Sequence, residues 1–160
     1  MSDPLATYLH DHLAGSRFAI ELVKELHEQH AGEPLGQFAA AELVQLEDER
    51  QVLQGIINQV GAEPSTLKEA TSWVGEKVSR FKLRRASSGE AGTFEALEAL
   101  ALGIVGRVAL WRALAVIAPI DNRVRGSDFD ALAEGAQAQH ARVDERRLQI
   151  ASIAFRAAPE

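Results

Sequence analysis

Cysteine is absent from this chain of 160 residues, and aromatic residues make up only 6% of it. Without cysteine, disulfides, thiolate metal ligands and cysteine nucleophiles are all excluded. Any metal or catalytic site must therefore be built from His, Asp and Glu. The two aromatic residues of the basic stretch 67–85, Trp73 and Phe81, are too few to form a base-stacking surface.

Excess positive charge is also missing, since the formal net charge is −6 at pH 7. Positive charge gathers in the stretch 67–85, which carries six Lys or Arg against two Glu. An acidic body disfavours binding to nucleic acid, so we expect no such partner. The first fifteen residues show neither the basic region nor the apolar run of an export signal. We therefore expect a cytoplasmic location.

One long apolar stretch stands out at 93–118, and it reads TFEALEALALGIVGRVALWRALAVIA. A helix that is apolar on nearly every side is normally buried. Three charged residues lie well inside this stretch, namely Glu98, Arg107 and Arg112. Each would cost roughly 2.5 to 3.5 kcal/mol in a membrane. The stretch is therefore expected to be the core helix of a soluble bundle, with no membrane partner.

The periodicity of apolar residues, broken by Pro and Gly, predicts an all-α protein with a single domain over 1–160. Helices are expected at about 3–30, 34–60, 66–83, 94–118 and 127–156, with Thr93 as the N-cap of the fourth. Short turns near Gly32 and Asn122 make two antiparallel hairpins. The helix 66–83 lies in the long crossover between them. Two hairpins joined by one long crossover form a ferritin-like four-helix bundle.

Three segments carry a family resemblance: TYLHDHLAG at 7–15, ELVQLEDER at 42–50 and LALGIVGRVALWRAL at 100–114. Over most of its length the chain resembles a group of small bacterial ferritin-like proteins. The resemblance implies the ferritin-like fold. None of the three segments is an active-site motif, so the resemblance implies no particular activity.

Several polar residues fall on the apolar stripes when each helix is wound at about 100° per residue. In the first helix His12 lies on the apolar face, whereas His10 and Asp11 point outward. In the second helix Glu42 and Glu49 lie one heptad apart among leucines. The whole inward set is His12, Glu42, Glu49, Glu98, Arg107, Arg112, His140 and Arg147. Buried carboxylates require partners.

One interpretation of this set is a dinuclear site for iron or manganese. Such a site takes a carboxylate from each of two helices and a Glu-x-x-His pair from each of the other two. Gln45 follows Glu42 at that spacing and Val52 follows Glu49, so neither forms the pair. With substituted ligands, the set would be His12, Glu42, Glu49, Glu98 and His140. The protein would then be an oxidoreductase or would handle iron.

The interpretation that we favour is a buried ion-pair network without a resident cofactor, in a bundle that is not an enzyme. Counting from the two turns brings several residues to the same levels: Glu98 with Arg147, His12 with Glu49 to Leu53, Glu42 with Glu98, and Glu49 with Arg107 and Arg112. Arginines at these levels would compete with a metal for the carboxylates. The gain in stability from such a network is small where desolvation offsets the attraction.

A second apolar side is expected on the same core helix, formed by Trp111 with Leu100, Ile104 and Leu114. A helix with two apolar sides can bury one inside its own chain. The other would then be covered by the crossover helix or by a second subunit. We therefore expect a homodimer.

Overall fold

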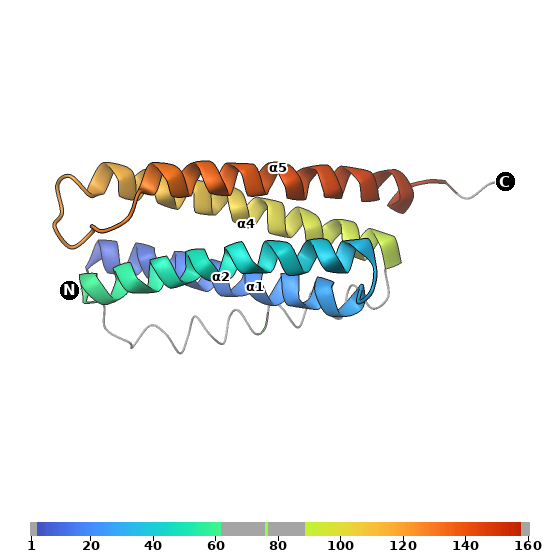
Figure 1. Ribbon diagram of the computed structural model, residues 1–160, viewed down its shortest axis with the longest axis horizontal. Coiled ribbons are helices and arrows are strands. Elements are labelled where there is room, and N and C mark those ends of the chain that lie inside the picture. The colour runs from blue at the N-terminus through green and yellow to red at the C-terminus, as the bar shows by residue number, and fades with distance from the viewer. Residues whose placement is uncertain (1–2, 62–75, 77–88, 158–160) are drawn as a thin grey trace.

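The fold is all-α in a computed structural model that describes residues 3–61, 76 and 89–157. These residues form four helices and no strand: α1 (Pro4–Gln29), α2 (Pro34–Val60), α4 (Gly89–Ile117) and α5 (Phe129–Ala154) (Figure 1). The all-α prediction is confirmed, and the four helix positions agree with it closely. Apart from Glu76, the helix expected at 66–83 lies outside the described residues.

The helices begin and end where the local sequence directs. Asp3 caps α1 by accepting a hydrogen bond from the backbone N–H of Leu5 at 3.0 Å, and Asp128 caps α5 in the same way through Ala131 at 3.0 Å. These side chains satisfy backbone donors that have no partner within the helix. Gly61 ends α2 in the left-handed conformation, with φ of 78°, which glycine adopts without steric cost.

The start of α4 differs from the prediction, which made Thr93 its N-cap. The helix begins one turn earlier at Gly89, and Thr93 is buried inside it with its hydroxyl donating to the Gly89 carbonyl at 3.4 Å. Two glycines in this turn give it a low helix propensity, so it reads as a linker. Gly92 is nevertheless buried. Packing therefore overrides propensity here.

The four helices form two antiparallel hairpins laid side by side (Figure 1). Helix α2 runs parallel to α4, and α1 runs parallel to α5. Between the hairpins, α1 and α4 pack most extensively, whereas α2 makes few close backbone approaches to the second hairpin. The largest fully buried side chains are Trp111, Leu9, Leu13, Leu26, Leu46, Leu53, Ile56, Leu97, Leu100, Ile104, Leu110 and Leu114. The arrangement is that of a helical bundle.

Specific contacts close both ends of the bundle. At the α1–α2 turn, a Cβ on Gly36 would lie 2.1 Å from the carbonyl oxygen of His30, so only glycine fits there. At the opposite end, Arg123 in the α4–α5 turn donates to Asp121 and also to Asp3, the N-cap of α1. This arginine therefore joins the second hairpin to the start of the first.

Among the described helices, α4 is long and apolar enough to be compared with a membrane span. An 18-residue window within it has a mean hydropathy of 1.8, and 39% of that window is buried. The core helix of a soluble protein passes the same test of length and composition. The hydropathy of α4 is therefore weak evidence for a membrane location.

Candidate functional site

Two carboxylates from α2 lie in the interior, as predicted. Glu42 is 3% exposed and Glu49 is 5% exposed. They project into the region where α2 stands away from the second hairpin, so long polar side chains fill the space between the helices. A buried carboxylate is stable only when its oxygens are hydrogen-bonded, which makes the partners the central question.

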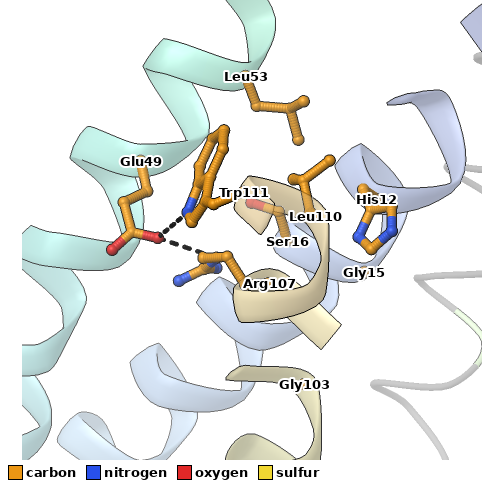
Figure 2. A pocket seen from close by; sticks show the side chains of 9 residues that line it. All are labelled: His12, Gly15, Ser16, Glu49, Leu53, Gly103, Arg107, Leu110 and Trp111. Atoms are coloured by element: carbon orange, nitrogen blue, oxygen red, sulfur yellow. Dashed lines mark hydrogen bonds and ion pairs between the residues drawn. The ribbon is translucent and has the colours of Figure 1, made fainter. Parts of the chain in front are cut away.

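Glu49 is held by donors from two helices, and Figure 2 shows the two that come from α4, Trp111 and Arg107. Its Oε2 accepts from Trp111 Nε1 at 3.1 Å and pairs with Arg107 Nε at 3.3 Å. Its Oε1 accepts from Gln45 Nε2 at 2.8 Å. Burial lowers the pKa of Arg107, and the charge of Glu49 opposes that effect. Since both side chains are buried, this ion pair has little contact with water.

Glu42 is held mainly from α5. Arg142 binds it with two parallel bonds, Nε to Oε1 at 2.8 Å and a terminal nitrogen to Oε2 at 3.0 Å. Gln139 Nε2 donates to the same Oε2 at 3.0 Å. The side chain of Arg142 is 47% exposed, and its hydrogen bonds to Glu42 raise its pKa. The second ion pair therefore has one buried partner and one partner in contact with solvent.

Two glutamines connect the ion pairs into a closed cycle. Gln139 donates to Glu42 and accepts from Arg107 at 3.5 Å, while Gln45 donates to Glu49 and accepts from Arg142 at 2.9 Å. Each amide thus turns its NH₂ toward a carboxylate and its oxygen toward a guanidinium. We call the cycle the polar ring; its members are Glu42, Gln45, Glu49, Arg107, Gln139 and Arg142. Its formal charges cancel.

A small cavity lies beside the ring, on the side toward α1 (Figure 2). Its volume is about 50 Å³, and its lining is His12, Gly15, Ser16, Glu49, Leu53, Gly103, Arg107, Leu110 and Trp111. This agrees with the predicted level of His12, opposite Glu49 to Leu53. Burial lowers the pKa of His12; the charge of Asp11 opposes this shift and that of Arg107 adds to it. Burial and the charge of Arg107 therefore both disfavour the protonated form of His12.

Five of the eight predicted inward residues are not fully buried, and His12, which is partly buried, is one of them. Glu98 and Arg112 are exposed, and His140 and Arg147 are only partly buried. The predicted pair of Glu98 with Arg147 is present at 3.0 Å, but it lies on the surface. Because α4 is apolar on nearly every side, its sequence does not reveal which face turns inward. For this reason the prediction of an inward side chain is correct for Arg107 and wrong for Arg112.

Two further predictions about facing residues are corrected. His10 was expected to point outward but is buried, whereas His12 is only partly buried. Trp111 was expected on a second apolar side for a partner to cover. Instead it lies 1% exposed in the core, stacked near Phe129 with ring centroids 6.2 Å apart. Its indole N–H faces Glu49, which accounts for its inward position.

Sequence reasoning missed the role of Gln139 and Arg142. Gln139 is fully buried, although it is not in the predicted inward set. Arg142 reads as a surface residue, and it reaches a buried carboxylate because its stem is long. The sequence contains only indirect evidence for these two residues. Two buried acids on α2 require hydrogen-bond donors at the same height in the bundle, and α5 is a helix that can supply them.

Metal ligands do not gather in the described part of the chain, where no three His, Asp or Glu side chains lie close enough to hold an ion. Comparison of the chain with protein-family models, with curated proteins and with solved structures gave no match. Interpretation of the site thus depends on its geometry.

Proposed function

We propose that this protein is a non-catalytic, ferritin-like helical bundle in which the polar ring occupies the place of a dinuclear metal centre. The observation that carries the proposal is the complete engagement of the two core carboxylates. Glu42 accepts three hydrogen bonds from Gln139 and Arg142. Glu49 accepts hydrogen bonds from Gln45 and Trp111 and is paired with Arg107. A cation at either carboxylate would have to displace these donors.

The charge balance of the interior supports the same conclusion. Two carboxylates and two guanidinium groups in the ring sum to zero, whereas a dinuclear centre surrounds its cations with excess negative charge. A divalent ion next to Arg107 would add positive charge to a site where that arginine is already desolvated. Glu98, which would supply a further carboxylate, faces outward and pairs with Arg147.

The topology supports the ferritin-like part of the proposal. Each hairpin is antiparallel, and α2 of the first runs parallel to α4 of the second. This is the arrangement of four-helix bundles with one long crossover. The adjacent cavity, at about 50 Å³, has room for water but is far smaller than the roughly 300 Å³ of a small substrate pocket. A cavity of this size therefore favours a structural role for the polar ring over turnover of a substrate beside it.

Metal binding tests the proposal directly. Protein purified without chelator is equilibrated anaerobically with Fe²⁺ or with Mn²⁺, desalted and analysed for metal content. The expected result is less than one tenth of an ion per chain. Binding of one or two ions per chain, lost in Glu49→Gln, would overturn the proposal and favour the oxidoreductase or iron-handling alternative.

The matched control is Asp48→Asn, on the same helix but exposed. If metal is bound, is lost in Asp48→Asn and is kept in Glu49→Gln, the ions occupy the surface and the polar ring is not their site. That outcome leaves the ring as the interior structure and supports the proposal.

A further inference from the structure

A seam of exposed residues on α4 is the strongest feature of the molecule that the polar ring does not use. Leu102, Val105 and Val116 are 69%, 50% and 72% exposed, and Ala109 between them is also exposed. Exposed single apolar residues are ordinary, but these four share one face of one helix. When another surface covers such a face, its apolar side chains are removed from water, which is favourable in free energy.

The spacing of the seam is that of a coiled coil. Its positions are Glu98, Leu102, Val105, Ala109, Arg112 and Val116, with successive steps of four, three, four, three and four residues. This alternation keeps side chains on one line facing a partner helix. From the first to the last position the seam extends for about 27 Å along the helix.

The charges of the seam are arranged symmetrically about Val105. Glu98 lies seven residues before it and Arg112 lies seven residues after it. In two antiparallel copies related by a two-fold axis at Val105, each Glu98 meets the Arg112 of the other copy. The same pairing sets each Leu102 near the small Ala109 of the other copy, so large and small side chains interlock.

From this self-complementarity we propose that α4 forms an antiparallel, two-fold symmetric contact with the α4 of a second copy, centred on Val105. A two-fold interface is isologous and needs a surface that is complementary to itself. Arg112 has no partner among the described residues of its own chain. Glu98 bonds Arg147 through Oε2 and remains 48% exposed at its side chain, so a second guanidinium can approach it.

A second copy fits the seam better than a lipid surface does. Glu98 and Arg112 stand in line with the apolar residues and would enter the hydrocarbon together with them, at a cost of a few kcal/mol each. In the antiparallel pair these two charges neutralise one another. The contact is also distinct from the predicted dimer surface around Trp111, which is buried in the chain's own core.

Single cysteines test the geometry, because the chain has none of its own. Val105→Cys places two thiols at the two-fold axis, and we expect it to form a covalent dimer under mild oxidation or with a short bismaleimide. Val116→Cys is the matched control. Its thiols lie about 16 Å from the axis and therefore about 33 Å apart, so cross-linking is expected to be at least tenfold less efficient.

A charge exchange tests the pairing in the full-length chain by sedimentation equilibrium up to about 100 μM. Arg112→Glu is expected to weaken the dimer at least tenfold, because it opposes two negative charges at each end. Glu98→Arg combined with Arg112→Glu restores the opposite charges and is expected to recover most of the affinity. Val105→Glu should abolish dimerisation, whereas Val44→Glu, at an exposed valine of α2, should leave it unchanged.

Several results would overturn the proposal. They are a wild-type chain that stays monomeric at the highest concentration, equal cross-linking of Val105→Cys and Val116→Cys, or failure of the double charge exchange to rescue Arg112→Glu while its thermal unfolding stays normal. Equal cross-linking would indicate a parallel contact. Binding of the wild type to phosphatidylcholine vesicles in place of dimerisation would show that the seam serves lipid.

Discussion

Glu42 and Glu49 lie one heptad apart on the same helix and are almost equally buried, yet their surroundings differ. Glu49 faces a buried arginine and a buried tryptophan, whereas Glu42 faces an arginine whose side chain is 47% exposed. The Glu49–Arg107 pair is buried away from bulk solvent, and the Glu42–Arg142 pair borders on it. Burial of the acid alone therefore does not determine how much an ion pair contributes to stability.

The exposure of the cationic partner decides how much each pair matters. A charge left alone in the interior costs several kcal/mol, while a charge that water can reach is partly compensated. The guanidinium of Arg107 loses its hydration on folding, whereas that of Arg142 keeps much of its own. We therefore expect the two ends of the polar ring to respond unequally to the same substitution.

The largest effect is expected for Arg107→Met. It leaves Glu49 buried with two neutral donors only, so the free energy of unfolding should fall by about 3–5 kcal/mol. Urea unfolding at pH 7 measures this change. Arg125→Met, at an exposed arginine, is the control and should stay within about 0.5 kcal/mol of the wild type. A loss below about 1 kcal/mol for Arg107→Met would contradict the difference between the two ends.

A smaller effect is expected for Trp111→Phe, which removes one donor to Glu49 while keeping an aromatic side chain. The loss should be about 1–3 kcal/mol, since a buried acceptor gives up a hydrogen bond. A double-mutant cycle with Glu49→Gln separates this bond from the change in packing. Additive losses in the cycle would show that the indole N–H contributes nothing to the site.

Arg142→Met should cost about 1 kcal/mol, because water can reach the oxygens of Glu42 that the guanidinium leaves. The cost should also shrink in 1 M NaCl, where partly exposed charges are screened. The loss from Arg107→Met should change little with salt. Equal salt dependence of the two variants would show that both ends of the ring are equally open to solvent.

The smallest expected effect is a dependence on pH through His12. Burial lowers its pKa below the ordinary value of 6.5, so the unfolded chain binds more protons than the folded chain just below that pH. The free energy of unfolding should therefore decrease as the pH falls below about 6.5. His12→Gln should flatten this part of the curve relative to the wild type. Curves of equal slope would contradict the shift.

The helices and the two carboxylates of the polar ring can be predicted from the sequence for a physical reason. In α2 the polar and apolar residues alternate with the helical period, so the inward positions of Glu42 and Glu49 can be read directly. In α4 apolar residues surround the helix, and periodicity cannot distinguish Arg107 from Arg112. The inward side of α4 is set by which neighbours it packs against, and that information lies outside the segment itself.

The rest of the site depends on side-chain reach across the bundle. Arg142 and Gln139 act on residues about 100 positions earlier in the chain, and helix registers cannot be matched to within one residue from turn counting. The count was accurate enough to pair Glu98 with Arg147 and to place His12 opposite Glu49. It did not show that the first pair is on the surface, because levels give height along the bundle and not depth within it.

The polar ring also affects how the two hairpins assemble. Its bonds join α2 to both α4 and α5, so a slide of α2 by one helical turn, about 5.4 Å, would separate the donors from their acceptors together. A bundle with α2 displaced in this way would bury two carboxylates without partners. Its free energy would be higher than that of two separate hairpins in water. We therefore expect the final association of preformed hairpins to be all-or-none, with a single permitted alignment.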